Sequence, residues 1–374
     1  MVGAGPAGLS AGYAAARAGA RTIVIERAEH PRYKTCGGGL IGTSYAAAAA
    51  RIEVPADDQI DRVTFTDNGR REFTRHYRPG RLLTMVRREE FDHRLRAAAV
   101  AAGARLRERV AVRGIEQGPD DVRLRLADGT ELTARTVVGA DGSAGVSARA
   151  VGVTYQQVDL GLELELPVPP EIAARWRGRL LLDWGPLPGS YAWIFPKGNR
   201  LTVGVIAARG EGERTRRYLR RFVERLGLDG YDPTHDSGHL TRCRAADAPL
   251  RKGRILVAGD AAGLLEPWTR EGISFALRSG ALAGAAAASG DLDGYVRSVY
   301  AQLVPPMRAG HRILAAFSRH PGVFHAAVAT PPGWRMFTAF CRGETTFDQV
   351  LTRRSVRATL ALLSSGRAES RPSG

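Results

Sequence analysis

The sequence predicts an α/β fold: a Rossmann-like dinucleotide-binding domain interleaved with an α+β domain on an antiparallel sheet, followed by a helical C-terminal region. Three observations support this. A glycine-rich turn separates a strand from a helix at 3–8, two further apolar strands lead into glycine-containing turns at 137–142 and 255–263, and residues 153–205 alternate polar and apolar side chains. The 374 residues also exceed one small core, at roughly 150 residues per domain.

The start of the chain has the pattern of a βαβ unit around the sequence GAGPAG. Gly3 permits a tight turn, Gly5 lets the backbone approach a pyrophosphate, and Gly8 allows close packing of helix and strand. Glu26 follows at about the distance expected of an acid that binds ribose hydroxyls. A glycine-rich turn without a ligand is the alternative. The unit comprises Val2, the turn 3–8, a helix over 9–18 and a strand over 22–25.

The first strand of this unit is short, because only Met1 and Val2 precede the first glycine. A missing central strand would expose the backbone groups and apolar faces of its neighbours. We therefore expect the natural reading frame to begin upstream of Met1, the alternative being an abnormally short strand.

The remaining segments divide the chain into discontinuous domains. Residues 87–113 indicate a helix and a strand, 122–136 a hairpin that turns at Asp128-Gly129, and 254–288 a buried strand, a loop and an alanine-rich helix. From Tyr295 on, the pattern is helical and basic. We assign 1–50, 82–150 and 250–294 to the nucleotide-binding domain, 51–81 and 151–249 to the sheet domain, and 295–374 to the helical region with a frayed tail.

The formal net charge of +16 does not indicate a nucleic-acid-binding protein. Only three of the 54 basic residues are lysines, and the arginines are spread along the chain among acids, as in the run at 87–90. This indicates a bias in composition. Acidic ligands such as pyrophosphates, or an anionic membrane face, stay open as partners.

Cysteine usage and hydropathy favour a cytoplasmic protein. The three cysteines include no CxxC pair, so neither a disulfide framework nor a zinc site is predicted, and the histidines show no metal-like spacing. No run reaches the roughly 20 apolar residues of a spanning helix. Residues 350–363 nonetheless indicate a basic amphipathic helix that fits a lipid headgroup layer, with ordinary packing on its own domain as the alternative.

Three separated motifs together resemble the FAD-binding signature of the flavoprotein class that includes p-hydroxybenzoate hydroxylase. They are GAGPAG with Glu26, GADG at 139–142, and AGDAAG at 258–263 with Pro267 and Gly272 downstream. The resemblance implies FAD as cofactor, a ribityl contact at Asp260, a diphosphate contact at Arg88 with solvated helix charge as its alternative, and a helix that points its positive end at the flavin. The implied cofactor-binding residues are Gly3, Gly5, Pro6, Ala7, Gly8, Glu26, Arg27, Arg88, Asp141, Gly142, Gly259, Asp260, Gly272 and Ile273.

Two further stretches narrow the resemblance to the geranylgeranyl reductase family. PRYKTCGGGL at 31–40 is similar to its cysteine and glycine segment, and YAWIFPKGNRLTVGV at 191–205 to its substrate-sheet segment. The likeness extends to about residue 288. It implies Cys36 and Tyr191 as catalytic residues and a substrate surface formed by Gly37, Gly38, Gly39, Trp193, Phe195, Pro196 and Lys197, with no metal. A small buried filler at Cys36 and a plain aromatic core along 191–195 are the alternatives.

This resemblance implies an FAD-dependent reductase that saturates C=C bonds in a prenyl chain of a lipid, quinone or prenyl diphosphate. NADPH or a reduced ferredoxin would reduce the flavin, which would deliver hydride to one alkene carbon. Cys36 or Tyr191 would supply or relay the proton to the other. A flavin monooxygenase or halogenase acting on an aromatic substrate is one alternative function, and a non-catalytic flavin-binding protein is another.

Overall fold

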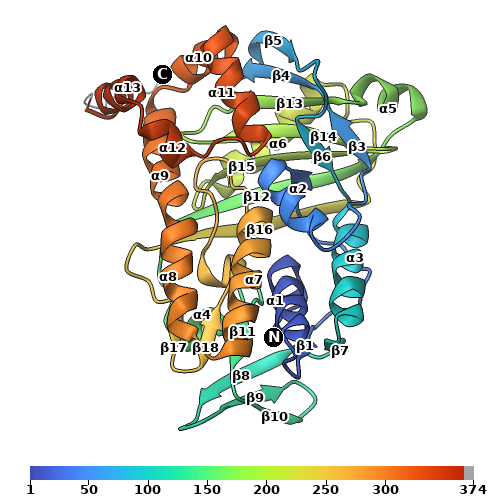
Figure 1. Ribbon diagram of the computed structural model, residues 1–374. Coiled ribbons are helices and arrows are strands. Elements are labelled where there is room, and N and C mark those ends of the chain that lie inside the picture. Colours follow the sequence, from blue (N-terminus) through green and yellow to red (C-terminus); the bar gives the residue numbers. More distant parts are fainter. Residues whose placement is uncertain (366–374) are drawn as a thin grey trace.

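The computed structural model describes residues 1–365. These residues form two halves, and each half is built from several separate segments of the chain (Figure 1). The lower half in Figure 1 contains short parallel strands and the helices α1, α3 and α7, and the upper half is built on a seven-stranded sheet. A column of helices from α8 to α13 follows one side of both halves. The architecture confirms the predicted fold class.

Met1 and Val2 occupy the centre of the parallel strands. Val2 forms single parallel bridges to Gly139 on one side and Ile25 on the other. The backbone nitrogen of Met1 donates to the Ile23 carbonyl at 2.7 Å. Two residues thus join the flanking pairs, which are β1 (Ile23–Ile25) with β7 (Arg105–Arg107) and β11 (Val137–Gly139) with β18 (Ile255–Val257).

Two helices of the nucleotide-binding half, α1 (Pro6–Arg17) and α7 (Ile273–Ser289), touch backbone to backbone. A Cβ atom at Gly280 would lie 2.2 Å from the Ala7 carbonyl oxygen, and one at Gly284 would lie 2.2 Å from that of Ala11. Only glycine allows this approach. The N-terminus of α1 also lies against the short 3₁₀ helix η1 (Gly259–Ala262), where a Cβ at Gly259 would be 2.9 Å from that of Ala7.

The seven-stranded sheet presents one face to α6 (Gly212–Arg225) and the other to the nucleotide-binding half. In β12 (Tyr155–Pro167), leucines at even positions pack toward α6. Asp159, Glu163 and Glu165 alternate with these leucines and lie on the opposite face. All neighbours are antiparallel except one parallel pair, β13 with β4. The order is β16 (His235–Arg244), β12 (Tyr155–Pro167), β15 (Arg200–Ala208), β14 (Tyr191–Lys197), β13 (Arg179–Trp184), β4 (Arg62–Asp67) and β5 (Arg70–His76).

Smaller elements complete the two halves. A three-stranded sheet joins β2 (Gly39–Leu40), β6 (Leu83–Met85) and β3 (Asp58–Ile60), and β17 (Arg251–Lys252) extends β18. The expected hairpin forms, with β9 (Val122–Leu126) between β8 (Val112–Gln117) and β10 (Glu131–Ala134). The remaining helices before the C-terminal region are α2 (Gly42–Ala49), α3 (Arg88–Ala101), α4 (Val146–Val151) and α5 (Pro170–Trp176).

The basic amphipathic segment expected over 350–363 is two helices, because the chain turns at 352–353. The apolar residues Val356, Leu360 and Leu363 pack with Ile313 of the preceding long helix, which favours the packing alternative over a free membrane face. Within residues 1–365, no helix is both long and apolar enough to cross a bilayer. The C-terminal helices are α8 (Leu292–Gln302), α9 (Val304–Arg319), α10 (Pro321–Ala329), α11 (Pro331–Cys341), α12 (Phe347–Leu351) and α13 (Arg354–Ser365).

We expect Gly284→Ala to lower the free energy of unfolding by about 1–3 kcal/mol, because the added methyl overlaps the Ala11 carbonyl. Alanine gains about 1 kcal/mol over glycine in helix propensity, so an open site would give the opposite sign. Gly322→Ala in α10 is the matched control, since its nearest atoms are side-chain ends at 3.8 and 3.9 Å. Urea denaturation of both variants measures the difference, and equal midpoints would contradict the backbone contact.

Candidate functional site

The N-terminus of α1 forms a cradle for an anionic group. Its N-cap is Gly5, no side chain caps it, and no acidic residue lies in its first turn. Gly3 has a φ of +93° and lies against Ala140, whereas a Cβ at Gly5 would meet only the Arg32 guanidinium at 3.8 Å. The free N–H groups and the open space beside Gly5 fit a phosphate.

Glu26 closes one side of this cradle at the end of β1. Its carboxylate is buried and accepts the backbone N–H groups of Ala4 at 2.7 Å and Ala28 at 3.0 Å. Each oxygen has a second lone pair that a ribose hydroxyl could use. Arg27, the next residue, is exposed.

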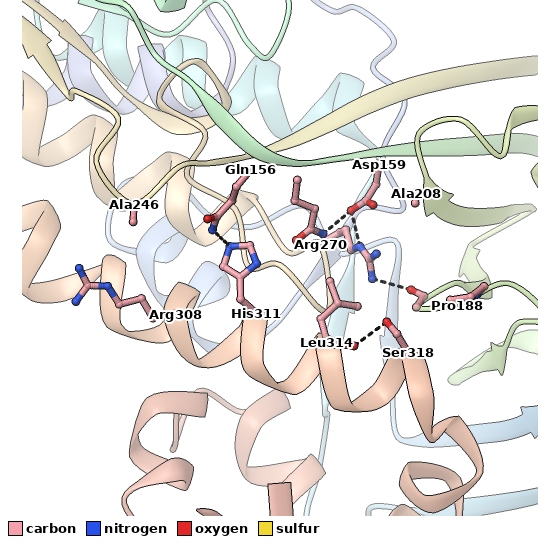
Figure 2. Close-up of a pocket in the computed structure, with 12 residues that line it drawn as sticks. Gln156, Asp159, Pro188, Ala208, Ala246, Arg270, Arg308, His311, Leu314 and Ser318 are labelled. Atoms are coloured by element: carbon pink, nitrogen blue, oxygen red, sulfur yellow. Dashed lines mark hydrogen bonds and ion pairs between the residues drawn. The ribbon is translucent and has the colours of Figure 1, made fainter. Parts of the chain in front are cut away.

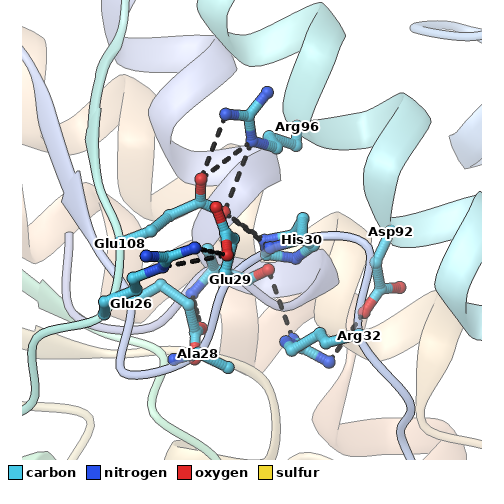
Figure 3. A network of polar contacts seen from close by, with 10 residues as sticks. Glu26, Ala28, Glu29, His30, Arg32, Asp92, Arg96 and Glu108 are labelled. Carbon is cyan, nitrogen blue, oxygen red and sulfur yellow. Dashed lines mark hydrogen bonds and ion pairs between the residues drawn. The ribbon is translucent and has the colours of Figure 1, made fainter.

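A polar network that the sequence did not reveal ties the loop after β1 to α3 (Figure 3). Glu108 accepts from the ring of His30 at 2.8 Å and from Arg96 at 3.0 Å, which keeps the pKa of Glu108 low although burial opposes this. Arg32 contacts Asp92 at 3.4 Å and the Ala4 carbonyl at 3.4 Å. No local pattern signals these pairs, since their partners are up to 78 residues apart.

Arg88 begins α3 and is buried against Asp92, one turn further along. Its Nε and Nη2 donate to the two carboxylate oxygens at 2.9 and 2.8 Å. Burial opposes the charged guanidinium, but Asp92 and the nearby Cys36 outweigh burial and raise the pKa of Arg88. The side chain therefore stays charged and lies between the nucleotide cradle and the cysteine segment.

Asp260 faces the same space from η1. His239 lies 3.6 Å from its carboxylate, and although burial alone would raise the pKa of Asp260, His239, Lys34 and Arg88 lower it. Burial lowers the pKa of Lys34 in turn. The structure thus gathers an ionised carboxylate and two cations around the expected cofactor position.

Acidic side chains at or beside other expected cofactor contacts accept from helix N-termini. Asp141 accepts the N–H of Ser147 at 3.1 Å, its second oxygen is buried without a partner in the described structure, and burial raises its pKa. Gly142, at φ +78°, has open space around it. Near Gly272 and Ile273, Glu271 accepts the N–H of Ser274 at 2.6 Å, and burial raises the pKa of Glu271 to about 7.

The aromatic residues expected to bind substrate form a row on β14. Ring centroids of Tyr191 and Trp193 are 5.8 Å apart, and those of Trp193 and Phe195 are 6.1 Å apart. Trp193 lies over Gly204, where a Cβ would come within 2.1 Å of the indole. Gly37 covers the other end of the row, with its Cβ position 2.7 Å from Phe195.

The two expected catalytic residues lie at different parts of this row. Cys36 is half-buried and precedes Gly37, the residue that lies against Phe195. Tyr191 donates its hydroxyl to the Thr269 carbonyl at 2.5 Å, and burial raises its pKa.

The other expected substrate residues are packed into protein. Lys197 is 3% exposed and pairs with Glu165 at 3.1 Å. A Cβ at Gly38 would lie 3.2 Å from the Lys197 ammonium, and Gly39 pairs with Met85 in the small sheet. Pro196 points to the opposite face of β14 by the alternation of the strand. No role was predicted for Glu163 and Glu165 from the sequence. The run GLELEL at 161–166 is the signal that could have indicated them, because it places charged residues on one face of an internal strand.

A cavity of about 570 Å³ lies between the sheet and α9 (Figure 2). Arg270 separates it from the aromatic row: its guanidinium pairs with Asp159 at 3.0 Å, donates to the Gly189 carbonyl at 3.1 Å and lies over the Tyr191 ring. None of the expected substrate residues lines this cavity. Residues 1–365 contain no cluster of His, Cys, Asp or Glu suited to a metal.

Comparisons with known proteins agree with this geometry. Residues 1–166 match the FAD binding domain family. The chain is 31% identical to a menaquinone reductase of Mycobacterium tuberculosis over 78% of this chain and 76% of that protein, and 28% identical to digeranylgeranylglycerophospholipid reductase 3 of Methanosphaera stadtmanae over 77% and 76%.

A solved structure shares the fold over nearly the whole chain. It is a geranylgeranyl bacteriochlorophyll reductase-like protein from Thermoplasma acidophilum, with a TM-score of 0.76 and 19% identity over 96% of this chain and 98% of that one. From the family match and the reductase relatives together, this chain belongs to the geranylgeranyl reductase family of FAD-dependent oxidoreductases.

Proposed function

We propose that this protein is an FAD-dependent reductase that saturates C=C bonds in the prenyl chain of a lipid or quinone. The observation that carries the proposal is the row of Tyr191, Trp193 and Phe195 beside Cys36 and the nucleotide cradle. The similarity to reductases named for menaquinone and for digeranylgeranylglycerophospholipid supports the substrate class. NADPH or a reduced ferredoxin is the proposed electron donor.

The residues that would hold FAD are those around the α1 cradle. The N–H groups after Gly5 fit the diphosphate, Glu26 has lone pairs for the ribose, and Asp260 with Arg88 faces the ribityl region. Gly142 leaves open space beside this path, and a Cβ at Gly272 would lie 3.5 Å from the Asp260 carboxylate. Bound and reduced, FAD supplies a hydride to a carbon placed against its ring.

At the alkene, the protein itself would supply an apolar surface that binds the prenyl chain and a proton donor. Aromatic side chains bind a prenyl chain by burial of apolar surface and exclude water from the reacting carbons. An isolated alkene requires a proton at its second carbon. We assign the proton to the thiol of Cys36, because the hydroxyl of Tyr191 is already donated to the Thr269 carbonyl.

We expect Gly5→Ala to weaken FAD binding at least about tenfold while the apoprotein stays as stable as wild type. The backbone at Gly5, with φ −82°, tolerates alanine, and the protein leaves room for its methyl. The methyl would fill space assigned to the diphosphate. Titration of apoprotein with FAD, followed by flavin fluorescence, measures this, with Gly230→Ala in an open loop as control. Unchanged affinity would remove the diphosphate from this cradle.

Cys36→Ala should reduce turnover about 10²- to 10⁴-fold, because it removes the proposed proton donor. Flavin content and thermal stability should match wild type, since Cys36 is only half-buried. Steady-state and single-turnover rates on purified holoprotein give the comparison. A variant with wild-type turnover would mean that the cysteine only fills space.

Anaerobic incubation of dithionite-reduced holoprotein with geranylgeranyl lipids and menaquinones tests the function itself. We expect mass spectrometry to show gains of two hydrogens per reduced bond, with reoxidation of the flavin. Dithionite makes the result independent of the natural donor. No mass gain, together with hydroxylated or halogenated aromatic products in air, would instead identify a monooxygenase or halogenase. Protein that cannot bind FAD at all would indicate a non-catalytic role.

A further inference from the structure

The backbone of Cys36 is held at both of its polar groups by buried charged side chains. Its N–H donates to Glu163 Oε1 at 2.9 Å, and its carbonyl accepts from Lys197 Nζ at 3.4 Å. Glu163 on β12 is 2% exposed and Lys197 on β14 is 3% exposed. The sheet therefore grips one peptide of a loop that lies 127 residues away from Glu163 in the sequence.

Both charged side chains are themselves held in place. Lys197 pairs with Glu165 at 3.1 Å, and Thr202 donates to the same Glu165 oxygen at 2.8 Å. Tyr33 directs its hydroxyl to Glu163 at 3.3 Å and contacts Ser237 at 3.0 Å. Hydrogen bonds of this kind give the cluster one defined geometry.

A cluster of buried charges holds a loop only at a large cost in desolvation energy. Burial of charges costs desolvation energy that their attraction often fails to recover, and apolar residues of similar volume are frequently as stabilising. A charged cluster under the expected proton donor is therefore explained better by positioning than by stability alone.

We propose that Glu163 and Lys197 form a clamp on the Cys36 peptide that positions the thiol for proton delivery. Both are positioning residues, because they act through Cys36 and its backbone. The inference rests on the proposed function for the purpose of the clamp, but the clamp itself can be observed without any substrate.

Glu163 is the titrating member of the clamp. Burial and the adjacent Glu165 raise the pKa of Glu163 to about 7, against the opposing effects of Lys197, the Cys36 N–H and Lys34. The carboxyl is thus mostly neutral at pH 6 and charged at pH 8. The titratable groups around it are Lys197 and Glu165 from the sheet, Tyr33, Lys34 and Cys36 from the loop, and His235, which stacks on Tyr33.

Ionisation of Glu163 changes how firmly the Cys36 peptide is held. A carboxylate accepts the backbone N–H more strongly than a carboxylic acid does, so the clamp tightens above pH 7. Below pH 7 the weaker hydrogen bond leaves the Cys36 peptide, and with it the side chain, held less firmly. Glutamine at this position reproduces the neutral acid only.

The test is alkylation of Cys36 by iodoacetamide in the FAD-loaded protein at pH 6 and pH 8. Cys243 and Cys341 are 0% and 3% exposed, so the folded protein reports on Cys36. We expect Glu163→Gln to match wild type at pH 6 and to react about threefold to tenfold faster at pH 8, because the Cys36 peptide is then held without the carboxylate and its side chain is more accessible. Glu171→Gln, at an exposed position on α5, should follow wild type at both values.

Tyr33→Phe provides a second variant that leaves every charge in place. Loss of its hydroxyl removes a donor to the ionised carboxylate, so the inflection of the Cys36 alkylation profile should move to higher pH. If Glu163→Gln and Tyr33→Phe both follow the wild-type profile, the clamp is wrong. If Glu163→Gln does not fold, an unshifted inflection in Tyr33→Phe alone overturns it.

The reduction assay separates this proposal from the proposed function. If prenyl chains are reduced, Glu163→Gln should lose turnover relative to wild type at pH 8 but not at pH 6; an equal loss at both values would contradict the titrating clamp. If alkylation behaves as expected but no prenyl substrate gains hydrogen, the clamp stands and the assigned substrate falls.

Discussion

The close approach of α1 to α7 is the constraint on which the rest of the nucleotide-binding half depends. Gly280 and Gly284 bring the two helix backbones together, and Gly259 brings η1 against Ala7. A single methyl at any of these places would displace the N-terminus of α1. The position of the cradle, and with it the direction of every free N–H group, thus follows from the absence of three side chains rather than from a hydrogen bond.

The sheet half depends on a different kind of force. Leucine and valine side chains on one face are buried by α6, which needs only apolar surface. On the opposite face, Asp159 pairs with Arg270 and Glu163 accepts the N–H of Cys36, both from the nucleotide-binding half. Glu165 pairs with Lys197 of the same sheet. Apolar packing therefore holds the sheet together, while directional polar contacts orient the two halves.

Sequence patterns predicted the structural features that depend on residues close together in the chain. The glycine turn at 3–8, the hairpin at 122–136 and the helix that begins near Gly272 follow from spacing and turn chemistry, and the structure has them. Pairs such as Arg32 with Asp92 and Cys36 with Glu163 could not be predicted, because spacing along one chain carries no information on contacts across 60 or 127 residues. The prediction of a single helix over 350–363 was wrong, because periodicity does not show where a turn interrupts a helix.

The two sides of the aromatic row differ in rigidity, and Arg270 makes one of them rigid. Its left-handed backbone, at φ +56°, is secured by an ion pair and by directional bonds to two carbonyl groups, all of which would break together if the loop moved. Across the row, α10 and α11 meet the sheet through phenylalanine and tryptophan rings, whose contacts have little directional preference. Rings can slide over one another at small cost. The helical side of the row can therefore shift at a lower cost than the loop of Arg270, which keeps its shape.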